Sequence, residues 1–144
     1  MSSEVEALVK EGRIERVEAD RAAAIDKLEE ARRHLDSASV IFESDPQGAY
    51  ALLYDAARKA IDAHMLAAGY RVSKSRLGTH EATARYATSV LGSGPHGKHA
   101  QHFDRMRRNR NRSEYGMWQV GRSTLEADLD HARGILRAIG EQLR

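Results

Sequence analysis

The sequence predicts an all-α protein, an antiparallel bundle of four to five helices. Apolar residues recur at three- and four-residue steps in at least three segments. The 144 residues include only two Pro, and Ala, Leu, Arg and Glu are more frequent than Val and Ile. The connections between the periodic segments are short, as in antiparallel bundles. We therefore expect one helical domain and no sheet.

The bundle is expected to span residues 16–144, after a polar N-terminal extension of residues 1–15. The extension has few apolar positions and either forms a short helix or stays frayed. Helical periodicity is clear from Arg16. The first apolar stripe comprises Val17, Ile25, Leu28, Leu35, Ala38 and Phe42.

The second helix is expected over residues 46–68. Asp45 is a good N-cap, and Pro46 is tolerated at the first helical position. Gly69 suits a left-handed C-terminal residue. The apolar face comprises Tyr50, Leu53, Tyr54, Ala57, Ile61 and Met65, and many further alanines permit close helix packing.

Three more helical segments follow a loop at residues 70–75. One is expected over residues 78–91, and the Gly92–Pro95 break separates it from another over residues 96–110. Ser123 and Glu126 have the spacing of a capping box, which predicts the start of the last helix. The apolar face of that helix comprises Leu125, Leu129, Ala132, Leu136, Ile139 and Leu143.

Composition excludes several classes of protein. Without cysteine, neither a disulfide framework nor a cysteine-based zinc site is possible. No apolar stretch approaches the roughly 20 residues that span a bilayer. The charged N-terminus lacks the hydrophobic segment of a secretory signal. We expect a cytoplasmic protein without membrane contact.

A run of arginines is the strongest indication of function. Arg105, Arg107, Arg108, Arg110 and Arg112 fall within eight residues, although the net charge of the chain is only +2. Guanidinium groups stay charged and match phosphate oxygens in pairs. The run therefore predicts a phosphate-bearing partner, most plausibly nucleic acid. The alternative is a solvated helix face, on which arginines also occur.

The segment 108–115 resembles the motif of the HEPN superfamily of small helical-bundle proteins. That motif is an Arg, usually followed by a polar residue, then four to six residues and a His, often with a Tyr two positions later. Arg108, Asn109 and Tyr115 fit, whereas Ser113 stands where the His is expected. Residues 49–69 also resemble the second HEPN helix, and the likeness covers about residues 22–143. The chain most resembles a bacterial subfamily with the pattern Arg-Asn-Arg-x-Glu-Tyr.

This resemblance implies an RNA-associated protein in a toxin–antitoxin or defence setting. Family members with the intact motif are metal-independent endoribonucleases and usually dimers, so we expect a homodimer, RNA as ligand, a possible antitoxin partner and no cofactor or metal. The candidate catalytic residues are Arg108, Asn109, Ser113, Glu114 and Tyr115. The alternative function is a non-catalytic helical interaction or dimerisation module.

The missing His leaves the identity of a proton acceptor open. The Ser113 hydroxyl is too weakly acidic to ionise at neutral pH without another base. Glu114 is a carboxylate base or, alternatively, the partner of Arg110 or Arg107 in a salt bridge. Tyr115 stacks on a base, bonds a phosphate, or packs beside Trp118.

The histidines are further candidates for metal ligands or bases. His96, His99 and His102 recur every three residues, but they lack the further converging ligands of a zinc site. His64 is expected to be a core or interface histidine, and it becomes a candidate base only if its face meets Arg108. His80, near a helix start, is expected to be a capping or surface residue.

Overall fold

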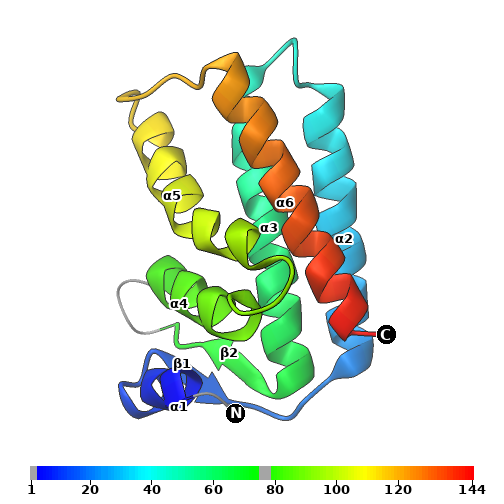
Figure 1. Cartoon of the computed structure of the whole chain (residues 1–144), viewed down its shortest axis with the longest axis vertical. Helices are drawn as coiled ribbons and strands as arrows, with labels where there is room; N and C mark the ends of the chain where they lie inside the picture. The colour runs from blue at the N-terminus through cyan, green and yellow to red at the C-terminus, as the bar shows by residue number, and fades with distance from the viewer. Residues whose placement is uncertain (1–2, 75–78) are drawn as a thin grey trace.

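The structure, a computed structural model, describes residues 3–74 and 79–144 and is an all-α helical bundle (Figure 1). The described elements are α1 (Ser3–Lys10), β1 (Ile14–Arg16), α2 (Arg21–Val40), α3 (Pro46–Ala68), β2 (Tyr70–Val72), α4 (Thr79–Leu91), α5 (Gly97–Glu114) and α6 (Arg122–Gln142). Among these helices, none combines the length and the apolar character that crossing a membrane requires.

The long helices α2, α3 and α6 form the centre of the bundle (Figure 1). α2 and α3 run antiparallel, whereas α3 and α6 run in the same direction. α3 lies between its neighbours and buries five alanines, so the helices approach closely. These are Ala49, Ala56, Ala57, Ala60 and Ala63, and Ala31 and Ala38 of α2 belong to the same core, with the larger Tyr50, Leu53 and Ile61. This part of the core therefore consists mainly of alanines, and a few large side chains occupy the remaining space between the helices.

The ends of α3 confirm the prediction from the sequence. The Asp45 carboxylate accepts a hydrogen bond from the Gly48 backbone N at 3.0 Å, and Pro46 occupies the first turn. At the other end, Gly69 has a φ of 94°, the left-handed conformation that closes a helix. Local signals fix both ends because each depends on residues within one turn of the helix.

α4 and α5 form a second layer against α3 and α6 (Figure 1). The start expected at Gly78 lies outside the described residues. α5 continues to Glu114, beyond the predicted end at residue 110, so all five arginines of the run are helical.

The N-terminal segment, residues 3–16, packs against the rest of the chain. Val5 and Leu8 of α1 and Ile14 of β1 are fully or almost fully buried, and α1 lies beside α4. Residues 1 and 2 of the expected extension lie outside the described residues. The described part of the extension therefore contributes to the hydrophobic core despite its polar composition.

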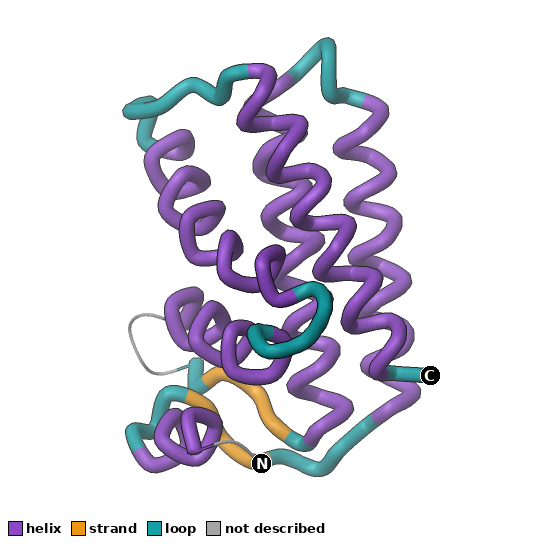
Figure 2. The backbone as a smooth tube through the Cα atoms, viewed as in Figure 1, coloured by secondary structure: helices purple, strands orange, loops and turns teal. Residues whose placement is uncertain are grey.

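A short antiparallel sheet differs from the expectation of no sheet (Figure 2). β1 pairs with β2, with Ile14 opposite Val72 and Arg16 opposite Tyr70. β2 lies in the segment predicted as a loop, whereas β1 ends at Arg16, where the helical periodicity was expected to begin; the helix α2 starts only at Arg21. Gly69 turns the chain back after α3, and its carbonyl accepts a hydrogen bond from the Val17 N at 2.9 Å. Three residues per strand are too few for an alternating pattern to be recognised.

The start of α6 also differs from the prediction. The helix begins at Arg122, its N-cap is Gly121, and no side chain caps it. The capping box predicted for Ser123 and Glu126 is therefore wrong. Glu126 instead accepts a hydrogen bond from the Arg122 Nε at 3.0 Å, an ion pair one turn apart on the helix.

Candidate functional site

The arginines of α5 divide between two sides of the helix. Arg105, Arg108 and Arg112 are exposed, whereas Arg107 and Arg110 are half-buried. The exposed three are separated by three and four residues, which places them in one line along a helix of 3.6 residues per turn. The five arginines of α5 therefore do not form one continuous surface: three lie on the exposed side of the helix and two on another side.

The exposed arginines belong to a longer polar line, here named the cationic stripe. It comprises Lys98, Gln101, Arg105, Arg108 and Arg112, all exposed and separated by alternating steps of three and four residues. At 1.5 Å per residue the line is about 21 Å long. Two of its arginines form long ion pairs: the Arg108 Nε lies 3.6 Å from Asp104 Oδ2, and the Arg105 Nη2 lies 3.7 Å from Asp128 Oδ1. The stripe therefore keeps donors for an external anion.

Arg107 and Arg110 are held by carboxylates of their own helix. Arg107 Nε donates to Asp104 Oδ1 at 2.8 Å. Arg110 Nη1 lies 2.9 Å from Glu114 Oε2. The salt-bridge alternative for Glu114 is thus the arrangement found, with Arg110 as its partner. The Glu114 side chain is 55% exposed, so the pair is open to solvent and weak.

Asn109 belongs to the interior and not to the exposed side. Its Nδ2 donates to the Tyr50 hydroxyl at 3.2 Å, and that hydroxyl donates to Asp128 Oδ2 at 2.6 Å. Asp128 is completely buried. Burial, with the hydrogen bond to Asp128 second, raises the pKa of Tyr50, so its hydroxyl remains a donor. Arg108 and Asn109, adjacent in the motif, therefore point to different environments.

Ser113 takes part in the turn that follows α5. The Gln47 Nε2 donates to the Ser113 Oγ and to the Trp118 carbonyl, the latter at 3.2 Å. The Gln47 Oε1 accepts from the Val120 backbone N at 2.6 Å. One glutamine of α3 thus holds the α5–α6 connection, and Ser113 is one of its attachment points.

Tyr115 is 77% exposed and lies at the C-terminal end of the cationic stripe. It is the C-cap of α5. Trp118 packs instead on Tyr50, with ring centroids 5.1 Å apart in an edge-to-face arrangement. An exposed aromatic ring beside a row of cations is available for stacking on a nucleobase.

A surface pocket of about 410 Å³ opens between α3, the start of α4 and the end of α5. We name it the α3–α5 pocket; it is lined by Ala51, Leu52, Tyr54, Asp55, Arg58, His80, Arg110, Asn111 and Glu114. The sequence predicted a capping or surface role for His80. Its partner Tyr54 lies 26 residues away, and no local pattern signals such a contact.

Tyr54 holds His80 in the pocket. The Tyr54 hydroxyl lies 2.9 Å from His80 Nδ1, and the Tyr54 ring stacks on Phe103 at 5.2 Å. Partial burial lowers the pKa of His80, and the charges of Arg58, Arg107 and Arg110 lower it further. His80 is therefore a neutral imidazole at neutral pH, close to several guanidinium groups.

Arg58 is fixed on the other wall of the pocket. Its Nη2 donates to Asp55 Oδ1 at 2.7 Å and its Nη1 to Asp62 Oδ2 at 3.2 Å. His34 of α2 approaches the second oxygen of Asp55 at 2.8 Å. Arg58 is thus oriented by two carboxylates and faces the pocket as a preorganised cation.

His64, His99, His102 and His131 do not line the α3–α5 pocket. Both ring nitrogens of His64 are hydrogen-bonded, to the Tyr86 hydroxyl at 2.8 Å and to Gln142 Oε1 at 2.6 Å, so His64 does not meet Arg108. His99 contacts His131 at 2.9 Å, and His102 stacks on His131. Within residues 3–74 and 79–144, no three His, Cys, Asp or Glu side chains are grouped as metal ligands.

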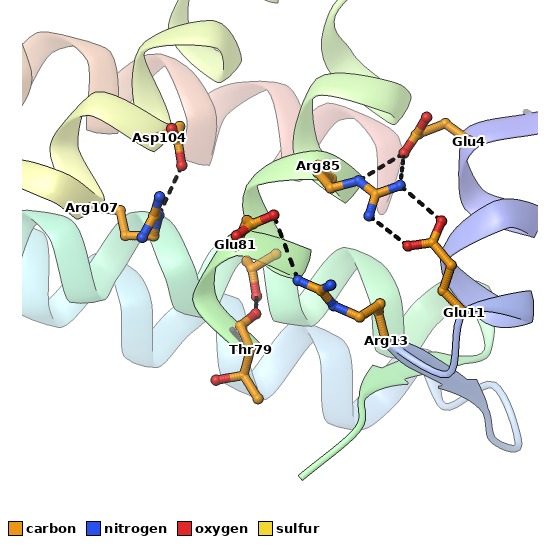
Figure 3. A network of polar contacts seen from close by, with 9 residues as sticks. Glu4, Glu11, Arg13, Thr79, Glu81, Arg85, Asp104 and Arg107 are labelled. Atoms are coloured by element: carbon orange, nitrogen blue, oxygen red, sulfur yellow. Dashed lines mark hydrogen bonds and ion pairs between the residues drawn. The ribbon is translucent and has the colours of Figure 1, made fainter. Parts of the chain in front are cut away.

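A larger pocket of about 660 Å³ lies between α1, α4 and α5 and has a mixed-charge lining that includes Glu81, Asp104 and Arg107. Figure 3 shows the ion pairs around it. Arg85 of α4 reaches across to α1, donating to Glu4 through Nε at 2.9 Å and to Glu11 through Nη1 at 3.0 Å. Most of these charges are neutralised, so this pocket offers no concentrated charge to a ligand.

The cationic stripe and the α3–α5 pocket adjoin each other on α5. Asn111 lines the pocket, and it precedes Arg112 and follows Arg108 by three residues on the same helix. Asn111 thus lies between the stripe and the rest of the pocket lining on α5.

Comparison with protein-family models, with curated proteins and with solved structures finds no match for this chain.

Proposed function

We propose that this chain is an RNA-associated, HEPN-like protein that binds single-stranded RNA along the cationic stripe. The observation that carries the proposal is the line of Lys98, Arg105, Arg108 and Arg112, exposed over about 21 Å. Arg105 and Arg108 form long ion pairs of 3.7 and 3.6 Å, so most of their five N–H donors remain for a ligand. The resemblance of the sequence to HEPN proteins supports RNA as the ligand, in a toxin–antitoxin or defence setting of the cytoplasm.

The chemistry of the stripe suits a flexible, single-stranded ligand. Its guanidinium groups bind phosphate oxygens without reading sequence. Tyr115, at the end of the stripe, offers a ring on which an unpaired base stacks. Binding is therefore expected to be salt-dependent and to have little sequence preference.

The test is the binding of a fluorescent 20-nucleotide RNA at several salt concentrations. Each phosphate neutralised on a single strand contributes about −0.7 to the slope of log affinity against log salt. Replacing Arg105, Arg108 and Arg112 together by Gln should lower the magnitude of the slope by about 2. The matched control replaces three exposed arginines of α2 and α6: Arg33, Arg133 and Arg137.

The control triple removes the same charge from another face, so it should retain most of the affinity. If both triple variants lost the same RNA affinity, net charge and not the stripe would be what attracts RNA. A wild-type chain whose binding ignores salt would contradict the proposal.

A second candidate function is a helical interaction or dimerisation module. The observation in its favour is the exposure of two large apolar side chains beside each other on the α5–α6 connection, Tyr115 at 77% and Met117 at 73%. A second copy of the chain or an antitoxin protein would cover them. Loss of dimerisation in Met117→Ser, with RNA binding intact, would support this function.

A further inference from the structure

We propose that a pocket between α2 and α6 binds a short, free phosphate chain, of which inorganic pyrophosphate and tripolyphosphate are the simplest forms. The pocket has a volume of about 340 Å³ and is here named the α2–α6 pocket. Four arginines line it: Arg32 of α2, Arg133 and Arg137 of α6, and Arg144 just after α6. This inference goes beyond the RNA-binding function and does not depend on it.

The α2–α6 pocket is separate from the cationic stripe. α2 and α6 pack on each other, and α6 lies between α2 and α5 in the view of Figure 1. The stripe runs along α5, and none of its residues lines the α2–α6 pocket. The two cationic surfaces are therefore formed by different helices, and each can be altered without the other.

Positive charge is concentrated in the α2–α6 pocket. Of the described residues that line it, only Asp36 is acidic, so the lining side chains carry a formal charge of +3, compared with +2 for the whole chain. The buried Leu35 and Leu136 supply the apolar part of the lining. Attraction between charges is stronger beside such an apolar wall than in open water, and a hollow of one sign focuses the field. The pocket is therefore suited to an anion with several charges.

The arginines keep most of their donors for a ligand. Within residues 3–74 and 79–144, no carboxylate forms an ion pair with Arg137. The Arg133 Nη2 donates to the neutral Ser39 hydroxyl at 3.2 Å, which directs this side chain toward α2. Arg32 pairs with Glu29, which is 52% exposed, so that pair is weak and solvent-screened. A guanidinium group has five N–H donors, so these contacts leave donors for phosphate oxygens.

Gly140 makes room for the Arg32 guanidinium beside α6. A Cβ at this buried position would lie 2.9 Å from the Arg32 Nη2. Gly140 has no positive φ, so the backbone does not require a glycine, and a glycine inside a helix is less favourable than an alanine. The space that Gly140 leaves therefore holds the Arg32 guanidinium against α6, on the same helix as Arg133 and Arg137.

The spacing of the arginines favours a chain of phosphates over a single one. Arg133 and Arg137 are about 6 Å apart along the axis of α6, and Gly140, where Arg32 lies, is about 4.5 Å further. A single phosphate can contact two neighbouring arginines, whereas two or three linked phosphates can contact all three. Each guanidinium fork matches two phosphate oxygens, a geometry that a more dispersed anion cannot satisfy three times.

The experiment is a calorimetric titration of the full chain at constant ionic strength. The probes are inorganic phosphate, pyrophosphate and tripolyphosphate, and the affinity should increase in that order. Citrate, a trivalent anion without phosphate, should bind about tenfold more weakly than pyrophosphate. ADP distinguishes the source of the phosphates, because a pocket that takes the free chain should bind pyrophosphate more tightly than ADP.

Single variants test the individual arginines. Arg137→Gln should weaken tripolyphosphate binding about tenfold, the usual effect of losing a hydrogen bond to a charged group. Its control is Arg33→Gln, which removes an exposed arginine of α2 outside the pocket lining and should bind as the wild type does. Gly140→Ala keeps every charge but displaces the Arg32 guanidinium, and it should weaken binding about threefold to tenfold.

A reciprocal pair of triple variants separates the pocket from the stripe. Replacing Arg32, Arg133 and Arg137 together by Gln should abolish tripolyphosphate binding. Replacing Arg105, Arg108 and Arg112 of the stripe by Gln removes the same charge and should leave tripolyphosphate binding intact. Circular dichroism of each variant should show the helical content of the wild type, because the replaced side chains lie at the surface.

Each outcome decides the inference. The expected order of affinities, together with losses confined to the variants of the α2–α6 pocket, would support it. No binding of pyrophosphate or tripolyphosphate at millimolar concentration, equal affinity for citrate, or tighter binding of ADP than of pyrophosphate would overturn it. Wild-type affinity in Arg137→Gln, or equal losses in the two triple variants, would overturn it as well. RNA binding along the stripe would stand in all of these cases, because it is measured separately.

Discussion

The Tyr50 hydroxyl lies 2.6 Å from Asp128 Oδ2 and joins α3 to α6 inside the bundle. Asp128 is completely buried, and a buried carboxylate is costly unless donors surround it. The same hydroxyl accepts from Asn109, so α5 is attached to the pair. Three helices thus share one polar node under the cationic stripe.

Removing the Tyr50 hydroxyl should destabilise the fold. Tyr50→Phe leaves Asp128 and Asn109 without their shared partner, and a buried unsatisfied group costs about 1–3 kcal/mol. Urea denaturation should show this loss in the free energy of unfolding. The control, Tyr115→Phe, changes an exposed hydroxyl and should leave stability unchanged. Equal stability of the two variants would mean that the node contributes little.

Acid should weaken the fold between about pH 7 and pH 5. Burial lowers the pKa values of His64, His99 and His131 below their ordinary value near 6.5. The folded state then binds fewer protons than the unfolded chain, so stability is present above about pH 6.5 and falls as pH drops through that range. Urea midpoints at pH 8 and pH 5.5 measure the difference. His131→Gln should make the dependence shallower, and an unchanged dependence would point to other groups.

Gly69→Ala should destabilise the junction between α3 and the sheet. The φ of Gly69 is 94°, a conformation that costs an L residue roughly 1–2 kcal/mol, and the added Cβ would lie 3.1 Å from the Val17 carbonyl oxygen. Gly94→Ala is the control because its Cβ would make an ordinary 3.5 Å contact at a position without positive φ. Thermal unfolding measures the stability of both variants. If Gly69→Ala lowered the unfolding temperature no more than Gly94→Ala does, this argument would be wrong.

We expect the chain to be a homodimer in solution. The expectation comes from the HEPN resemblance, and the exposed Tyr115 and Met117 are apolar surface that a second copy would cover. Light scattering at micromolar concentration should give about twice the 16.1 kDa mass of one chain. A monomer mass that persists up to 100 μM would count against the dimer.

The sequence predicts the helices better than the contacts that form the candidate site. Asp45 and Gly69 mark the ends of α3 because capping depends on neighbouring residues. The contacts of His80 with Tyr54 and of Tyr50 with Asp128 join residues 26 and 78 positions apart, and no local pattern encodes them. The start of α6 was misplaced because Ser123 and Glu126 have capping-box spacing while the helix already begins at Arg122.

Arg108 and Asn109 are neighbours in the chain, yet only Asn109 helps to attach α5 to the bundle. Among the outer residues of α5, Arg105 lies 3.7 Å from the buried Asp128 Oδ1, whereas Lys98, Gln101, Arg108 and Arg112 can vary without refolding the protein. Charge reversals placed one at a time along that outer side would trace the route of a bound strand in an intact molecule. The same scaffold, with other residues at those positions, would accept a different partner, so ligand choice in this architecture can evolve separately from stability.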